Sequence, residues 1–247
     1  MMKNIKIWYL YNSGFAVKIN EKLLIFDYYN DIPYDLDENL NSGVIRPDDL
    51  KDLDVYVFVT HKHHDHYNKV IYSWEQLNIA HSITYLLSND IKDALCNNVH
   101  FFESHQDCLI DDLRILTLKS NDEGISFYVQ VNDVNLFHSG DLNWWCWEDE
   151  SDEWKEGIEQ TYKSEIGRLK NLPLDIAFIP VDPRLKFNYY LSLKYFIDKI
   201  MPEHCTVIPM HFGDQYSIFN QLSTDGYLEN KNILSISKRG QMFEIFC

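Results

Sequence analysis

An unbroken apolar segment at residues 55–59 leads directly into Thr60-His61-Lys62-His63-His64-Asp65-His66, and this junction constrains the chain more than any other feature. A short continuous apolar run predicts a strand that is buried on both faces. His61 and His63 stand two residues apart at the end of that strand, so both rings can point the same way. Asp65 and His66 follow at once, where a turn can direct them toward a neighbouring position. The junction therefore predicts four candidate metal ligands in one loop.

Neutral imidazoles combined with a carboxylate suit zinc, and suit manganese or iron less often. The alternative interpretation is a histidine-rich surface loop that binds no metal. Chance placement of four such groups directly after a buried strand is improbable. We therefore expect a metal site at this loop.

The other segments alternate between strand and helix patterns. Residues 5–27 predict three strands in a meander. Further strands are expected at residues 84–87, 99–102, 113–118, 125–131, 134–137, 174–181, 206–210, 233–237 and 242–246, and helices at 65–74, 152–172 and 189–200. Polar residues 28–50 predict a long loop, which is either a lid over a site or a surface insertion. Two sheets packed face to face with helices outside would account for this order, which indicates an α+β fold.

Composition excludes several classes of protein. The net charge of −16 repels polyanions, so nonspecific nucleic-acid binding is disfavoured. A small anionic substrate is still allowed, because a bound metal ion can invert the local field. The five cysteines show no C-x-x-C spacing, the first residues lack a signal-peptide pattern, and no apolar run approaches a membrane span. We expect a cytoplasmic protein with reduced thiols, no membrane partner and no nucleic-acid partner.

The motif His61-x-His63-x-Asp65-His66 after a buried strand resembles the signature of the metallo-β-lactamase superfamily of metal-dependent hydrolases. Three further elements agree in their order along the chain: residues 24–27, which end in Asp27; His138-Ser139-Gly140-Asp141; and Pro209-Met210-His211. The resemblance covers nearly the whole chain. It implies one domain over residues 1–247, folded as an αββα four-layer sandwich. Residues 141–145 and 181–184 resemble a branch near the ascorbate-lactonase-like enzymes.

The resemblance implies a ligand set for two divalent metal ions, most often Zn²⁺, with Mn²⁺ or Fe²⁺ as alternatives. His61 and His63 would bind the first ion. The second would be held by Asp65, His66 and His211, and Asp141 would bridge both. Asp27 either orients a ligand histidine through its other ring nitrogen or caps a turn after its strand.

The chain departs from the family pattern at the first metal. The family usually supplies a further histidine before the hairpin that leads to Gly-Asp, and residues 120–124 of this chain contain none. Asn121 or Asp122 could supply a weak oxygen ligand, or water could fill the position. His138 lies on the strand itself and is expected beside a ligand rather than as one. Asn12 stands where related chains often have a histidine before Ser-Gly.

Three residues near Asp141 are candidates for the substrate pocket. Trp144 and Trp145 follow Asp141 closely and are interpreted as an aromatic wall, with packing of a helix onto the sheet as the alternative. Arg184 could pair with a substrate anion, but a structural pair with Asp182 is favoured.

The function that the resemblance implies is hydrolysis of a small molecule. Two ions would hold a hydroxide between them at neutral pH, and this hydroxide would attack a carbonyl or phosphorus centre. Asp65 would orient it and pass a proton to the leaving group. Ester, lactone, amide and phosphodiester bonds all fit, and the oligomeric state is left open. The alternatives are a non-catalytic metal-binding or sensor protein and a di-iron redox protein on the same scaffold.

Overall fold

The computed structural model describes residues 4–94, 96–229 and 232–246. The chain forms two compact units, one made of Met1–Phe102 with Ile236–Cys247 and the other of Glu103–Ser235. Residues 1–3, which belong to the segment without a signal-peptide pattern, and Cys247 lie outside the described residues. The expectation of a single domain over residues 1–247 stays a prediction.

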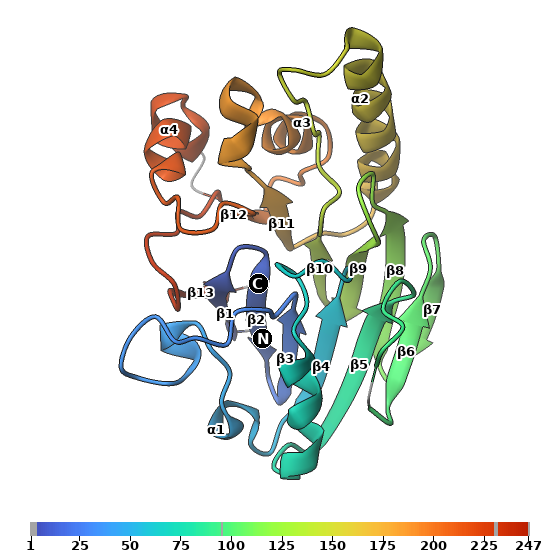
Figure 1. Cartoon of the computed structure of the whole chain (residues 1–247), viewed down its shortest axis with the longest axis vertical. Coiled ribbons are helices and arrows are strands. Elements are labelled where there is room, and N and C mark those ends of the chain that lie inside the picture. The colour runs from blue at the N-terminus through green and yellow to red at the C-terminus, as the bar shows by residue number, and fades with distance from the viewer. Residues whose placement is uncertain (1–3, 95, 230–231, 247) are drawn as a thin grey trace. The chain divides into compact units, whose positions relative to one another are not determined.

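The first unit is built on a mixed sheet with the strand order β13-β1-β2-β3-β4-β5-β6 (Figure 1). Its strands are β1 (Asn4–Tyr11), β2 (Gly14–Ile19), β3 (Lys22–Phe26), β4 (Asp54–Val59), β5 (Ser82–Ser88), β6 (Val99–Phe102) and β13 (Met242–Phe246). Neighbours are antiparallel from β13 to β3 and parallel from β3 to β6. Because β3 and β4 are parallel neighbours, the residues that follow them, Asp27 and Thr60, emerge at the same edge of the sheet.

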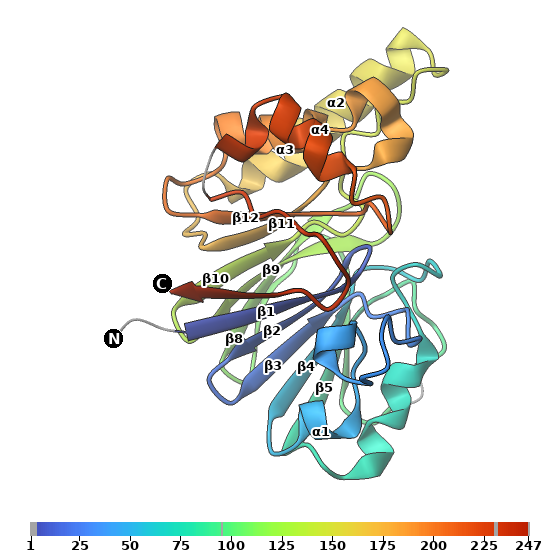
Figure 2. The same ribbon diagram turned by 90° about the vertical axis from the view of Figure 1, so that its left-hand side faces the viewer.

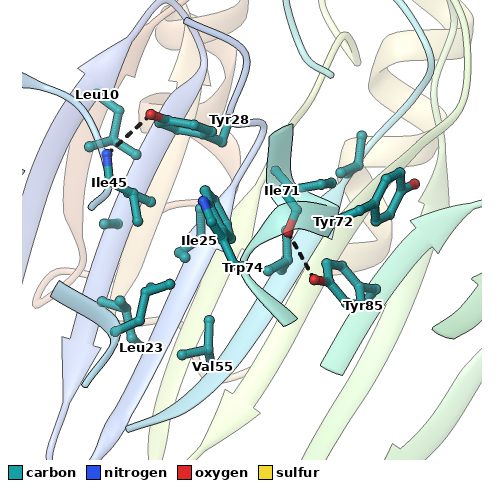
Figure 3. Close-up of a cluster of buried hydrophobic side chains, with 14 of the residues drawn as sticks. Leu10, Leu23, Ile25, Tyr28, Ile45, Val55, Ile71, Tyr72, Trp74 and Tyr85 are labelled. Atoms are coloured by element: carbon teal, nitrogen blue, oxygen red, sulfur yellow. Dashed lines mark hydrogen bonds between the residues drawn. The ribbon is translucent and has the colours of Figure 1, made fainter. Parts of the chain in front are cut away.

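A hydrophobic cluster packs on one face of this sheet, where strand residues such as Ile25 and Val55 meet Ile71 and Trp74 from the connecting segments (Figure 3). Tyr85 is tied to this layer because its hydroxyl donates to the carbonyl of Ile71 at 2.9 Å. The short helices of the unit are η1 (Leu40–Ser42), α1 (Pro47–Leu50), η2 (Lys69–Ser73) and η3 (Glu75–Leu77). The loop expected at residues 28–50 therefore contains two short helical turns.

The helix expected at residues 65–74 is wrong in length and type. Only η2 forms there, as a short 3₁₀ segment. Asn68 is extended, with φ −137° and ψ 128°, and its side chain accepts the N–H of Val70. Because Asn68 caps η2, the helix begins only after the motif, and residues 61–66 form a loop that is separate from the helix.

The second unit is built on a sheet with the strand order β12-β11-β10-β9-β8-β7. Its strands are β7 (Asp107–Ile110), β8 (Leu113–Lys119), β9 (Ile125–Val131), β10 (Val134–His138), β11 (Ile176–Pro180) and β12 (Thr206–Met210). Strands β10, β11 and β12 are parallel, and the other neighbours are antiparallel. The residues that follow the three parallel strands, among them Asp141, Asp182 and His211, therefore come from one edge.

Helices lie on one face of the second sheet (Figure 2). They are α2 (Asp152–Ile166), α3 (Leu191–Lys199) and α4 (Ile218–Thr224), with the short segments η4 (Gly167–Leu169), η5 (Pro183–Asn188) and η6 (Tyr227–Glu229). The hydroxyl of Tyr162 in α2 donates to the carbonyl of Ser192 in α3 at 3.0 Å, and this hydrogen bond links the two helices. In the described segments of the chain, no helix has the length and apolar character needed to cross a bilayer.

The strand expected at residues 233–237 does not form. Ile233 makes only an isolated bridge to Val207, and Leu234 donates one further bond to the Val207 carbonyl. The N–H of Ser237 donates instead to the side-chain oxygen of Gln241 at 2.7 Å. A side-chain partner thus replaces the ladder that the apolar pattern predicted.

Candidate metal centre

The motif histidines of the first unit form a tight group at the end of β4. The ring centroids of His61 and His63 lie 4.6 Å apart, and those of His61 and His66 lie 4.1 Å apart. A turn brings them together, since the N–H of His66 donates to the carbonyl of His63 at 3.0 Å. His61 and His66 are buried, so these two histidines do not belong to an exposed surface loop.

Asp27, the residue directly after β3, contacts this group through His66. Its backbone has φ 45°, and its N–H donates to the carbonyl of Phe58. The carboxylate accepts the N–H of Thr60 at 2.8 Å and the hydroxyl of Thr60 at 2.7 Å, and Nδ1 of His66 lies 2.7 Å from Oδ2. Of the two roles expected for Asp27, the contact with a ring nitrogen of His66 is the one that a candidate metal ligand would need.

These hydrogen bonds decide which ring nitrogens of His61 and His66 carry the proton. Oδ2 of Asp27 can only accept, so Nδ1 of His66 carries the proton and Nε2 keeps its lone pair. The hydroxyl of Thr60 donates its only proton in a hydrogen bond to Asp27, so the hydroxyl oxygen can only accept from His61 Nδ1, which lies 3.1 Å away. His61 Nδ1 is therefore also a donor, and both histidines offer Nε2 as a metal ligand.

Asp65 completes the group in the first unit. One of its oxygens, Oδ2, lies 3.7 Å from Nε2 of His66. The same oxygen accepts a hydrogen bond from the side-chain amide of Asn12 at 3.2 Å. A carboxylate oxygen beside an imidazole lone pair is an arrangement that a divalent cation would stabilise.

The second unit carries a matching group after its parallel strands. Oδ1 of Asp141 lies 3.1 Å from Nε2 of His211, and Nδ1 of His211 lies 3.1 Å from Oδ2 of Asp182. His211 has φ 67°, a left-handed conformation that is uncommon for this residue and turns the chain directly after β12. Asp182 therefore orients His211 in the same way that Asp27 orients His66.

Asp182 is the functional residue that sequence reasoning missed, because it was considered only as a partner of Arg184. Burial alone would raise the pKa of Asp182, but hydrogen bonds from His211 and Arg184 lower the pKa below its usual value. The available signal was its position directly after a buried strand, which matches the position of Asp27.

Three further residues were expected near the first metal: Asn121, Asp122 and His138. Both ends of the Asn121 amide contact the backbone of Asn143, at 2.8 Å and 3.1 Å, so this side chain fixes a loop. Asp122 has a carboxylate oxygen within 4.8 Å of one of Asp141, where it could supply a ligand. Nδ1 of His138 accepts the N–H of Gly140 at 3.2 Å, which supports the turn before Asp141.

Trp145 lies next to the second group. Its indole N–H donates to the carbonyl of Asp141 at 3.1 Å, and its ring centroid is 5.6 Å from that of His211. Trp147 stacks on Trp145 at 5.9 Å, and the guanidinium of Arg184 lies over both rings. An aromatic wall beside His211 thus consists of Trp145 and Trp147.

Trp144 and Arg184 make the structural contacts that were the alternatives to their pocket interpretation, which stays a prediction. The ring of Trp144 is contacted by the ammonium of Lys163 at 4.6 Å and packs with Tyr162, so it belongs to the helical layer. Arg184 forms several hydrogen bonds with the carboxylate of Asp182, which is the structural pair that the sequence favoured.

Comparisons with known proteins bear on the fold. No protein-family model matches the sequence, and no curated protein matches it. Among solved structures, the chain is similar to Igni18, a metallo hydrolase from the hyperthermophilic archaeon Ignicoccus hospitalis, with a TM-score of 0.64 and 15% identity over 98% of both chains. It is also similar to the metallo-β-lactamase fold protein YhfI from Bacillus subtilis, with a TM-score of 0.62 and 12% identity over 98% of this chain and 99% of that one.

The chain has the metallo-β-lactamase fold. The α+β class and the αββα sandwich predicted from the sequence are therefore confirmed, at the level of the fold. The chain is also similar to part of CmlA, a diiron β-hydroxylase from Streptomyces venezuelae, with 10% identity over 86% of this chain and 45% of that one and a TM-score of 0.55. Structural similarity alone therefore does not assign a metal chemistry to this chain.

Proposed function

We propose that this protein is a metal-dependent hydrolase whose two groups of side chains together supply the ligands for two divalent ions. His61, His63 and Asp141 would hold the first ion, with Asp122 as a further oxygen donor. Asp65, His66, His211 and the shared Asp141 would hold the second. The nitrogen and oxygen donors of this set suit zinc, with manganese and iron as alternatives.

One observation carries this proposal: two buried histidines each have a carboxylate on the ring nitrogen opposite the metal-facing one. Asp27 lies 2.7 Å from His66 Nδ1, and Asp182 lies 3.1 Å from His211 Nδ1. Carboxylates in this position fix the tautomer and orientation of metal-binding histidines. Any buried histidine needs a hydrogen-bond acceptor, so the feature that favours metal binding is that each pair also lies beside a further candidate ligand. Oδ2 of Asp65 lies 3.7 Å from Nε2 of His66, and Oδ1 of Asp141 lies 3.1 Å from Nε2 of His211.

Bound divalent ions would supply a Lewis acid and lower the pKa of a coordinated water to near neutrality. The side chains of this protein would orient the reaction. Asp65 offers a carboxylate beside the second group of ligands and could accept and return a proton. Trp145 presents an indole next to His211 and would exclude water from that side.

The proposed substrate is a small molecule with an ester, lactone, amide or phosphodiester bond. The net charge of −16 argues against a nucleic-acid partner, and the proposal places the protein in the cytoplasm.

The test is metal-dependent turnover. Purified protein is stripped with chelator, reloaded with Zn²⁺, Mn²⁺ or Fe²⁺, and assayed against ester, lactone and phosphodiester panels. We expect turnover that needs metal and is lost in Asp141→Ala together with at least one ion. Asp175→Ala, which removes a carboxylate that contacts Asn135 and His204, is the matched control and should keep both.

Two results would overturn the proposal. Oxygen consumption by the iron-loaded protein without hydrolysis would favour the di-iron redox alternative. Tight metal binding with no turnover on any panel would favour a sensor or metal-binding role.

A further inference from the structure

Asn12 lies in the turn between β1 and β2, and its backbone is held in one conformation. It has φ 53°, a left-handed value that Asn adopts more readily than most residues. Its N–H donates to the hydroxyl of Tyr9 at 2.9 Å, and Tyr9 is itself buried in the sheet. The orientation of the Asn12 side chain is therefore set by the fold of the first unit.

The side chain of Asn12 contacts the loop of candidate metal ligands at residues 61–66. Nδ2 of Asn12 donates to Oδ2 of Asp65 at 3.2 Å, across 53 residues of sequence. The accepting oxygen is the one that lies 3.7 Å from Nε2 of His66. The amide thus binds the carboxylate at the oxygen nearest to another candidate ligand atom.

The turn that carries Asn12 is anchored from a distant part of the chain. The guanidinium of Arg239, itself buried, donates to the backbone carbonyls of Leu10 at 2.5 Å and of Gly43 at 2.9 Å. Its other bonds go to the carbonyls of Asn30 at 2.6 Å and of Ile32 at 2.6 Å. It also lies 5.2 Å from the ring of Tyr11, the residue before Asn12. This network limits movement of the turn.

We propose that Asn12 is a positioning residue that fixes the carboxylate of Asp65 for metal binding. This inference rests on the proposed function. A carboxylate oxygen has more than one acceptor site, so an amide N–H on Oδ2 fixes the carboxylate without preventing a cation from binding it. Because the amide is neutral, it orients the carboxylate without removing its negative charge. A residue that orients a metal ligand in this way raises metal affinity without touching the metal.

Asn12→Gly tests the role with little disturbance of the turn, because glycine adopts φ 53° readily. Asn20→Gly is the matched control: Asn20 also has φ 53°, in the exposed turn between β2 and β3. The probe is Co²⁺ alone, followed by equilibrium dialysis and visible absorption. We expect Asn12→Gly to weaken one of the two ions about tenfold and to alter the absorption of that ion. Asn20→Gly should bind Co²⁺ as the wild type does.

A double-mutant cycle separates positioning from a general effect on the fold. If Asn12 acts through Asp65, Asn12→Gly has no further effect on Co²⁺ affinity in an Asp65→Ala background. An equal loss in both backgrounds would overturn the proposal, as would unchanged affinity and absorption in Asn12→Gly alone. A wild-type protein that bound no Co²⁺ would instead overturn the proposed function, so the two failures are distinguishable.

Discussion

The carboxylate of Asp27 and the imidazole of His66 form a fully buried pair, with Oδ2 2.7 Å from Nδ1. The counterpart of Asp27 in the second unit, Asp182, also bonds Arg184, whose side chain is 58% exposed. The pair in the first unit is therefore more isolated from water than its counterpart in the second. Because low dielectric strengthens a hydrogen bond and makes its loss costly, the first pair should be the more sensitive to substitution.

Asp27→Asn tests this pair. Both carboxylate oxygens accept hydrogen bonds, so an amide must place its NH₂ against a donor, either of Thr60 or of His66. One buried donor left without an acceptor costs about 1–3 kcal/mol of unfolding free energy. We also expect metal affinity to fall roughly 10–100-fold, because the His66 ring is no longer oriented. Urea unfolding and metal titration measure the two effects.

Asp175→Asn is the control for that experiment. Asp175 accepts two hydrogen bonds from Asn135, so its substitution should lower stability without changing metal affinity. An equal loss of metal affinity in both variants would contradict the role of Asp27.

Trp145 should report metal binding by fluorescence, because its ring is 5.6 Å from His211 and its indole N–H donates to Asp141. We expect Zn²⁺ to change tryptophan emission in the wild type and Trp145→Phe to lose most of that change. Trp154→Phe, in helix α2, should keep it. A change that persisted in Trp145→Phe and vanished in Trp154→Phe would contradict the assignment.

The two proposed ions should leave the protein in separate steps. The second would have four protein ligands, Asp65, His66, His211 and Asp141. The first would have His61, His63 and Asp141, with Asp122 as a further oxygen. Fewer strong donors in fixed geometry give weaker binding, so the first ion should leave first. Titration with a chelator while metal per chain is measured should show two steps, and His63→Ala should remove only the earlier one.

Gly240 joins the last strand of the first unit to its first, since its N–H donates to the carbonyl of Tyr9 at 2.8 Å. It has φ 74°, and a Cβ there would lie 1.9 Å from the carbonyl oxygen of Asn41. We expect Gly240→Ala to cost about 3 kcal/mol, from left-handed strain and from the clash together. Denaturant unfolding measures this cost.

Two other glycines are controls for that prediction. Gly226 has φ 82° with no atom within 4 Å of a Cβ, so Gly226→Ala should cost only about 1 kcal/mol. Gly157 lies inside α2 with open space around it, and Gly157→Ala should stabilise by about 0.5–1 kcal/mol. Equal costs at 240 and 226 would show that the contact with Asn41 is not the cause.

Cys96 should resist alkylation at neutral pH. Burial, with a contribution from Glu75, raises the pKa of its thiol from 9.0 to about 11. The thiolate is the reactive form, so its fraction at pH 8 falls by roughly 100-fold relative to an ordinary cysteine. Peptide mapping after iodoacetamide treatment should show labelling of Cys96 that rises steeply toward pH 11. Rapid labelling of the folded protein at pH 8 would contradict the environment described.

The parts of the site that local sequence encodes were predictable. The apolar residues of β4 and the spacing of His61, His63 and His66 are visible within a few residues of each other. Asp182 and Asn12 were not predictable in their roles, because their partners lie 29 and 53 residues away. Those contacts depend on which strands are neighbours and which turn faces which loop. Neither follows from the period of a hydrophobic pattern.

The fold shows the same limit. Long periodic segments such as α2 were predicted, whereas β7 and α4 are short and were not expected. The segment at 233–237 has the apolar alternation of a strand but lacks a full ladder partner, since Val207 supplies only one bridge. Tertiary pairing, rather than propensity, decides whether such a segment becomes a strand.

The first unit takes its sheet from both ends of the sequence, because β13 pairs with β1 and Arg239 holds the carbonyl of Leu10. During synthesis, the strands up to β6 emerge well before residues 236–246, with the whole second unit translated in between. At about 5–20 residues per second, this interval lasts on the order of ten seconds. The edge of β1 stays unpaired for that time, and the turn of Asn12 lacks its anchor. An unpaired strand edge can pair with other chains, so the first unit is exposed to aggregation until residues 236–246 have been made.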